Sequence, residues 1–347
     1  MTPRLLAPIL LTATITPAAI AQHITTEYGI DFVTVGDPGN APVPPEFFEI
    51  FDPQPWGSVG YKYRMARTEV SLGQWNEFVT AYLPHYSGST VNPGLTGSGL
   101  RISFGQVVYN NGFLPEHAAN LSWEFAARYC NWLHNGKVNE AWAFENGAYD
   151  TSTFFVDENG IAQHQLARHP DAQFWIPNHD EWIKAAHYDP NRYGAGEGGY
   201  WIYPNASDEP LIPGLPEDGG ETNAGYLTPR TPIGSYPDVQ SAWGLLDVSG
   251  GVREWTESLR GSDARMRYTR GTAAGDSFPE LFDRVDYDQV GLVNSHIRTG
   301  LRVATVIPAP PSFVIMCGLS ILVNRRSRPR DRVFSCTPIC TDQVPAK

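Results

Sequence analysis

The stretch Trp243-Gly-Leu-Leu-Asp-Val-Ser-Gly-Gly-Val-Arg-Glu-Trp-Thr256 is the most informative part of this sequence. It places the acidic residues Asp247 and Glu254 on either side of a Ser-Gly-Gly turn that leads into an aromatic strand. These two carboxylates, with the backbone carbonyls of Gly250 and Val252 between them, are hard oxygen ligands of the kind that Ca²⁺ prefers. The spacing therefore predicts a calcium site, but a capped hairpin turn whose acids face water would have the same spacing.

Four further blocks flank this stretch in the chain. They are Tyr63-Arg-Met-Ala-Arg-Thr-Glu-Val-Ser-Leu-Gly-Gln-Trp-Asn-Glu-Phe78, Leu121-Ser-Trp-Glu-Phe-Ala-Ala-Arg-Tyr-Cys-Asn-Trp132, Phe174-Trp-Ile-Pro-Asn-His-Asp-Glu-Trp-Ile-Lys-Ala-Ala186, and the pair Tyr268-Thr-Arg-Gly-Thr272 and Gly300-Leu-Arg-Val-Ala304. In this order, the five blocks resemble the signature segments of the formylglycine-generating (sulfatase-modifying factor) family. The resemblance implies an α+β fold, namely the family's loop-rich, single-domain variant of the C-type-lectin-like fold.

The resemblance also implies where this fold would bind metal ions. It places structural calcium ligands at the same four positions, through the side chains of Asp247 and Glu254 and the carbonyls of Gly250 and Val252. It further implies a second calcium site that begins at Asn223 and Ala224.

The resemblance implies a copper(I) centre in the family's oxidases, and this chain lacks the residues for it. Those enzymes hold copper with two cysteines five positions apart, and the matching positions here are Asp276 and Leu281. Thiolates are the soft ligands that select copper(I), and a carboxylate or an alkyl group is a poor substitute. Cys130 falls on the apolar face of a predicted helix, where a buried thiol stays protonated and inert. We therefore expect no bound copper, no catalytic residue and no other cofactor.

The composition is that of an acidic, loop-rich globular protein. The chain has 37 acidic and 25 basic residues, a net charge of −12, and 33 glycines and 29 prolines among 347 residues. Nucleic-acid binding relies on clustered Lys and Arg, so this charge balance argues against a nucleic-acid partner.

The first 21 residues read as an export signal. Arg4 precedes an apolar run from Leu5 to Ile15, and Ala19-Ile-Ala21 is a small-x-small cleavage site. The alternative of a buried N-terminal helix conflicts with Pro8 and Pro17. The sequence therefore predicts a protein exported to the periplasm, the outer envelope or the extracellular matrix of a bacterium.

Residues 307–347 resemble a PEP-CTERM sorting tail. The segment Pro308-Ala-Pro310 precedes an apolar run over 313–323, which an arginine cluster follows. Eleven residues span about 17 Å as a helix, short of the roughly 30 Å hydrocarbon core, which favours transient membrane association and later cleavage. A permanent short anchor with positive-inside arginines is the alternative.

The remaining chain, residues 22–306, is expected to form the single domain. Three amphipathic helices are predicted, beginning after Ser71, Ser122 and Asn178, with Gln74 and Glu181 as capping partners at the first and third. Residues 188–229 read as a long loop. Short strands are predicted at 31–35, 231–236, 252–256, 268–271 and 301–306. The histidines, including His179 and His187, are expected to be exposed or hydrogen-bonded rather than to form a site.

Three functions fit these observations. The first is an exported, non-catalytic domain that binds an extracellular protein or glycan. The second is an oxidoreductase of the same family whose metal site the sequence does not reveal. The third is a purely structural component of the cell surface.

Overall fold

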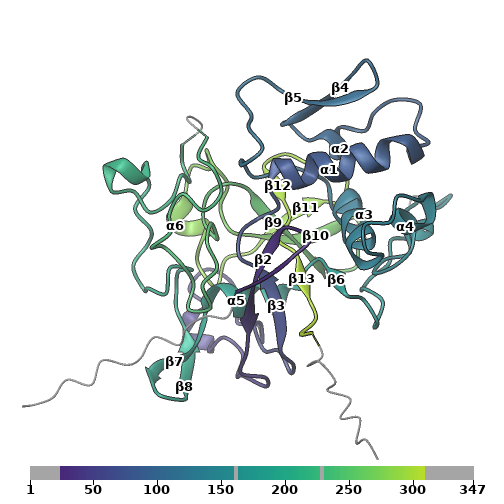
Figure 1. Ribbon diagram of the computed structural model, residues 1–347. Coiled ribbons are helices and arrows are strands. Elements are labelled where there is room, and N and C mark those ends of the chain that lie inside the picture. The colour runs from purple at the N-terminus through teal and green to yellow at the C-terminus, as the bar shows by residue number, and fades with distance from the viewer. Residues whose placement is uncertain (1–23, 160–162, 227–229, 309–347) are drawn as a thin grey trace, which may run out of the picture. The chain divides into compact units, whose positions relative to one another are not determined.

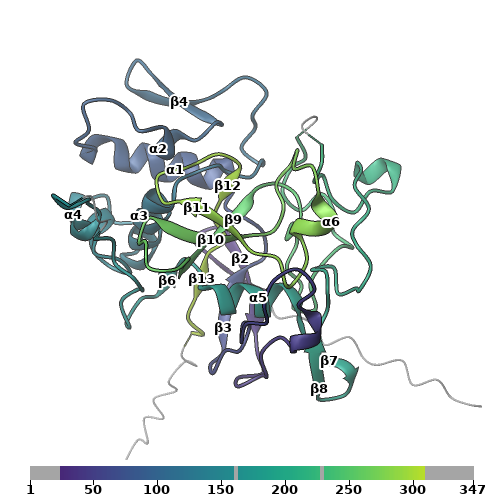
Figure 2. The ribbon, with the colours of Figure 1, turned by 180° about the vertical axis from the view of Figure 1, so that it is seen from behind.

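The computed structural model describes residues 24–159, 163–226 and 230–308. The predicted export signal and nearly all of the predicted sorting tail lie outside these residues. Figures 1 and 2 show the described part from opposite sides.

Two antiparallel-rich sheets form the centre of the domain (Figure 1). The five-stranded sheet has the order β1-β2-β3-β13-β6, with β1 Thr25–Glu27, β2 Ile30–Val35, β3 Tyr63–Ala66, β13 Ala304–Thr305 and β6 Phe174–Trp175. The four-stranded sheet has the order β11-β10-β9-β12, with β11 Gln289–Leu292, β10 Met266–Arg270, β9 Arg253–Leu259 and β12 Thr299–Gly300. The last segment of the domain thus passes from one sheet to the other between β12 and β13.

Two hairpins lie at opposite ends of the domain in both ribbon views. One is formed by β4 Leu100–Ser103 and β5 Gln106–Tyr109, and the other by β7 Tyr188–Gly194 and β8 Glu197–Tyr200. The helices are α1 Leu72–Tyr82, α2 Pro93–Thr96, α3 Trp123–His134, α4 Ala141–Glu145, α5 His179–His187 and α6 Pro279–Phe282. Short 3₁₀ turns are η1 Pro45–Phe47, η2 Leu83–His85, η3 Thr151–Thr153 and η4 Pro216–Asp218. No helix among the described residues is long and apolar enough to span a bilayer.

The three predicted helices are confirmed, and their caps explain where they begin. Ser71 accepts a hydrogen bond from Gln74 N while the Gln74 side chain accepts from Ser71 N, and Asn178 and Glu181 form the same reciprocal capping box at α5. Ser122 does precede α3, but its side chain makes no capping hydrogen bond. The helices are therefore positioned mainly by the burial of their apolar faces.

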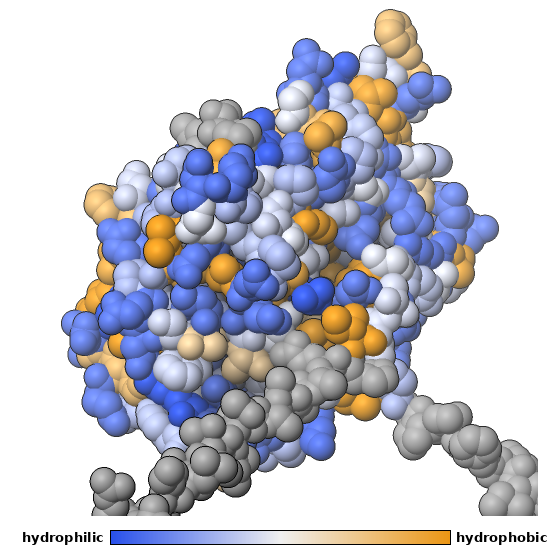
Figure 3. Space-filling view, turned by 60° about the vertical axis from the view of Figure 1, so that its left-hand side comes forward, coloured by the Kyte–Doolittle hydropathy of each residue, from blue (hydrophilic) through white to orange (hydrophobic). Residues whose placement is uncertain are grey.

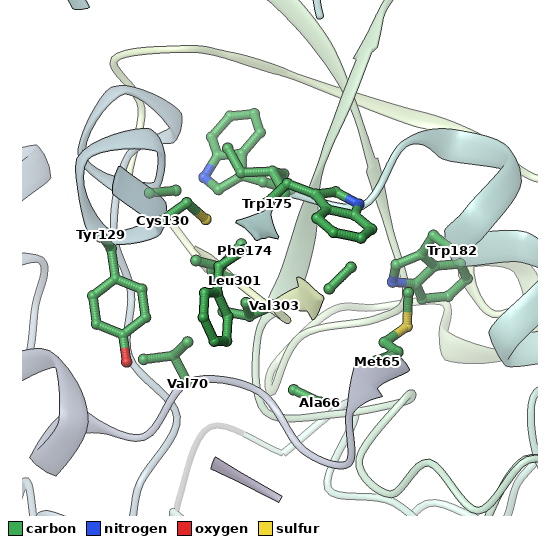
Figure 4. Packing of buried hydrophobic residues seen from close by; sticks show 14 of the residues in the cluster. Met65, Ala66, Val70, Tyr129, Cys130, Phe174, Trp175, Trp182, Leu301 and Val303 are labelled. Atoms are coloured by element: carbon green, nitrogen blue, oxygen red, sulfur yellow. The ribbon is translucent and has the colours of Figure 1, made fainter. Parts of the chain in front are cut away.

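The core lies where these helices meet the five-stranded sheet. Figure 4 shows Cys130 and Tyr129 of α3 packed towards Phe174, Leu301 and Val303, all of which are buried. Burial raises the pKa of the Cys130 thiol well above its usual range, as expected for an inert cysteine. Burying aromatic and aliphatic side chains of this size supplies most of the driving force for folding.

Some predicted elements are wrong. Residues 231–236 form no strand, because Pro232 lacks an N–H and the N–H of Gly234 donates to the side chain of Asp247. Residues 188–229 were predicted to be a loop, but they begin with the β7–β8 hairpin. The register of this hairpin shifts between Asp189 and Gly194, so its strands have no regular alternation that the sequence could reveal. The predicted strand over 301–306 is reduced to β13, because the chain changes sheets there.

Candidate functional site

A buried ion pair between Arg302 and Glu254 organises the predicted site. Arg302 Nη2 donates to Glu254 Oε1 at 2.6 Å, and Arg302 Nε lies 2.9 and 3.0 Å from the two carboxylate oxygens. The indole N–H of Trp182 donates to Glu254 Oε2 at 2.6 Å. The other Arg302 contacts include the main-chain carbonyls of Leu246 and Asp247. The side chain of Glu254, a predicted calcium ligand, is therefore held by three N–H groups.

Asp247 shares a small cavity with a second carboxylate, that of Glu69. The cavity has a volume of about 10 Å³. Asp247 Oδ2 accepts from Gly234 N at 2.6 Å, and Glu69 Oε1 accepts from Val252 N at 3.3 Å. Glu69 Oε2 is buried and has no hydrogen-bond partner among the described residues. Burial raises the pKa of both carboxyls, that of Asp247 to about 6, and the Asp247 charge raises the pKa of Glu69 further.

The Ser-Gly-Gly turn brings the backbone close to these carboxylates. Gly251 has a φ of +56°, and a Cβ at this position would lie 2.2 Å from Glu69 Oε1, so only glycine fits. Asn223 Oδ1 accepts from Gly251 N at 2.8 Å and so fixes the turn. Asn223 and Ala224, where the second calcium site was predicted to begin, are both buried. The amide oxygen of Asn223 is thus used to hold the turn.

Asp276 is buried and fully engaged by two arginines. Arg253 donates through Nη2 to Oδ1 at 2.6 Å and through Nε to Oδ2 at 3.0 Å, and Arg298 Nη1 donates to Oδ1 at 3.1 Å. The N–H of Ala273 donates to Oδ2 at 2.9 Å. Leu281 lies in α6 and is partly buried. A saturated carboxylate and an alkyl side chain therefore occupy the two positions that match the copper cysteines.

Arg298, which pairs with Asp276, also lines a pocket of about 310 Å³. The pocket is built from loops, because none of its lining residues belongs to a strand or a helix. Its charged or ionisable lining residues are Arg230, Arg298, His117 and His296, and no aspartate or glutamate of the described chain lines it. A cationic pocket on a chain with a net charge of −12 is a local reversal of charge.

The histidines of the described ranges do not gather with other potential metal ligands. No group of three or more His, Cys, Asp or Glu side chains within the described ranges could hold a metal ion. His164 contacts the carboxylate of Glu124 at 2.8 Å, as a hydrogen-bonded histidine should. His179 and His187 depart from the prediction, because both rings are buried and neither ring nitrogen has a partner in the described residues. Burial lowers the pKa of both, so the rings are neutral.

Residues 42–307 match the family model of the sulfatase-modifying factor enzyme 1-like domain. The chain belongs to this family. No curated protein matches it. The α+β domain that these residues form is thus a sulfatase-modifying factor domain.

Solved structures with the fold of this domain cover most of the chain. The Treponema denticola variable protein 1 has a TM-score of 0.52 and 16% identity, and the match covers 83% of this chain and 99% of that one. CarF has a TM-score of 0.45 and 19% identity over 80% of this chain and 99% of its own. PvdO from Pseudomonas aeruginosa has a TM-score of 0.45 and 16% identity over 80% and 95%.

Several site residues of this sulfatase-modifying factor domain were missed by sequence reasoning. Glu69 lies in the first block, between Thr68 and Val70, and nothing in this local sequence shows that its side chain is buried. Arg230 and Arg298 lie in loops without periodicity, so nothing in the sequence shows that they line one pocket. Two residues 68 positions apart line one pocket because of how the chain folds, which no local pattern shows.

Proposed function

We propose that this sulfatase-modifying factor domain is an exported, non-catalytic binding domain. The observation that carries the proposal is Asp276, whose carboxylate is saturated by Arg253 and Arg298 at a position that matches a copper cysteine. A soft cation such as copper(I) gains nothing from a hard carboxylate that already has two cationic partners. The pocket lined by Arg298 is the surface that we assign to ligand binding.

The assay for formylglycine formation tests this proposal. The purified protein is incubated with copper, a reductant, oxygen and a sulfatase-type cysteine peptide, and the aldehyde is measured by mass spectrometry. We expect no conversion above a control without protein, whereas an active formylglycine-generating enzyme converts the peptide in parallel. Conversion well above the control would instead support an oxidoreductase of this family.

We also propose a structural calcium ion beside the Ser-Gly-Gly turn. The unpartnered oxygen of Glu69 next to the carboxylate of Asp247 supports it, because two buried acids are stabilised by a divalent cation. Asp247 and Glu69 would supply carboxylate oxygens, and Gly250 and Val252 carbonyl oxygens. Glu254 would act indirectly, since Arg302 engages its carboxylate. The ion would tie the turn to the first block of the domain.

Export and processing are part of the same proposal. The predicted signal over 1–21 and the arginine-flanked apolar run over 313–323 support export with transient membrane association through the C-terminal segment. Mass spectrometry of the protein from its own host is the test. We expect a chain that begins at Gln22 and ends near Pro310, and a mature chain that retains Cys336 and Cys340 would identify a permanent anchor instead.

A further inference from the structure

We propose that the 310 Å³ pocket binds the carboxylate of an acidic saccharide, an inference that rests on the proposed binding function. The starting observation is charge. Two arginines and two histidines line the pocket and no acid of the described chain does, although the whole chain is strongly acidic. A concave surface of one sign concentrates ligands of the opposite sign and speeds their association.

The guanidinium group of Arg230 is held in place but not neutralised. It lies over the ring of Phe113, with Cζ 3.9 Å from the ring centroid. No carboxylate within the described residues pairs with it. Stacking fixes the plane of a guanidinium while its N–H edges stay available, which is the geometry for bidentate recognition of a carboxylate.

Arg298 supplies a second anchored donor. Its Nη1 donates to Asp276 Oδ1 at 3.1 Å and to Gly275 O at 2.9 Å, and these are the hydrogen bonds of its side chain to the described residues. Its side chain remains 42% exposed, whereas that of Asp276 is 1% exposed. One edge of the guanidinium is therefore fixed to the protein and the other can donate to a ligand.

The rest of the lining offers neutral hydrogen-bonding groups. His117 Nδ1 accepts from Leu114 N at 3.1 Å, so a neutral His117 carries its proton on Nε2 as a donor. Asn120 Oδ1 accepts from the Ser98 hydroxyl at 2.6 Å, which leaves the amide Nδ2 to donate. Together with the apolar side chains of Val252 and Ile297, these groups match the hydroxyls and C–H faces of a sugar.

The pocket favours a saccharide over a peptide. An extended peptide gains affinity by pairing with a free strand edge, and no strand contributes to this lining. The volume is at the small end of ligand pockets, which suits one charged sugar residue at a chain end. On the face shown in Figure 3, apolar side chains are scattered among polar ones and form no broad patch for a hydrophobic partner.

Calorimetric titration with an oligomer of uronic acid tests the inference. We expect the purified protein to bind this oligomer and not the neutral oligosaccharide of the same length. Raising salt from 50 to 500 mM should weaken binding, since screening reduces charge attraction. Arg230→Gln and Arg298→Gln should each weaken binding about tenfold or more, equivalent to about 1.4 kcal/mol. Arg265→Gln, an exposed arginine outside the pocket, removes the same charge and should leave binding unchanged.

The opposite results would overturn the inference in recognisable ways. The inference is wrong if the uronate oligomer does not bind, or if the neutral oligosaccharide binds as tightly. It is also wrong if an oligoglutamate peptide or inorganic phosphate binds more tightly than the uronate oligomer. An equal effect of Arg230→Gln and Arg265→Gln would also overturn it, with thermal melts confirming that both variants fold. Failure of the proposed function gives a different result, because formylglycine formation would appear in the peptide assay whatever the saccharide titration shows.

Discussion

The side chain of Arg302 contacts several segments of the site that are far apart in the sequence. Besides the carboxylate of Glu254, it donates to the carbonyls of Ala66 and Arg67 at the end of β3 and to those of Leu246 and Asp247. Its side chain is fully buried. A buried charge is tolerated only when it is paired and its donors are satisfied, and Arg302 meets both conditions.

Glu254→Gln should therefore destabilise the protein strongly. The change removes the carboxylate that pairs with the buried guanidinium of Arg302, and breaking a buried pair on one side costs about 3–5 kcal/mol. Urea denaturation measures the free energy of unfolding. Glu77→Gln is the control, because Glu77 pairs with Lys137 at the surface and such pairs contribute about 0–1 kcal/mol. A similar decrease in the free energy of unfolding in both variants would show that the buried pair contributes no more than a surface pair.

Asp283 should give the stability a pH dependence. Burial raises its pKa from 3.8 to about 7, although the hydroxyls of Ser249 and Thr272 donate to it. The folded state thus keeps a proton that the unfolded chain loses near pH 4, so this contribution is fully present below about pH 4 and is lost as the pH rises to about 7. Asp283→Asn removes the titration and should raise the free energy of unfolding at pH 8 by a few kcal/mol.

The measurement for Asp283 is the difference between the two proteins in unfolding free energy from pH 4 to 8, at constant calcium. Asp263→Asn is the matched control, because Asp263 contacts Arg265 at the surface, and it should not reproduce the pH-dependent difference expected for Asp283→Asn. A constant difference between wild type and Asp283→Asn across this range would contradict the raised pKa.

Among the elements, the three longest helices were predicted, whereas α2, α4, α6 and most strands were not. In α1, the apolar spacing and the Ser71–Gln74 cap are both local, and the buried residues Leu72, Trp75 and Phe78 are those that the spacing predicts. Strands of two residues, such as β6 and β13, have no period to detect. They exist because β13 pairs with both β3 and β6, which are far from it in the chain.

The two serine caps provide a test at this scale. Ser71→Ala should cost about 1 kcal/mol, because the N–H of Gln74 loses its acceptor. Ser122→Ala should be neutral or slightly stabilising, since the Ser122 hydroxyl is buried without a partner in the described chain and its removal relieves a desolvated polar group. Urea denaturation of both variants measures the two changes in the free energy of unfolding, provided that the dependence on urea concentration (the m-value) is unchanged. A larger loss for Ser122→Ala would mean that its hydroxyl caps α3 after all.

At the scale of the molecule, the blocks quoted from the sequence converge in space. Glu69, Trp182, Glu254 and Arg302 come from four different blocks, and each contacts another of them or the turn that Glu254 follows. The sequence could show that these blocks recur in one family. It could not show that Arg302 would pair with Glu254, or that Glu69 would lie beside Asp247, because both contacts depend on the tertiary arrangement of the loops.

Calcium should stabilise the whole fold, and this is the most direct test of the acidic cavity. Binding to the folded state alone contributes about 2.7 kcal/mol at a free concentration one hundred times the dissociation constant, so the melting temperature should rise by several degrees over protein in chelator. Asp247→Asn should reduce that difference, because it removes one negative charge from the calcium ligands without unpairing Arg302. Glu254→Ala is unsuitable, since it destabilises the fold with or without the ion. Asp263→Asn should retain the full calcium response. If wild type melts at the same temperature in calcium and in chelator, the two carboxylates form a buried acidic pair and not a cation site.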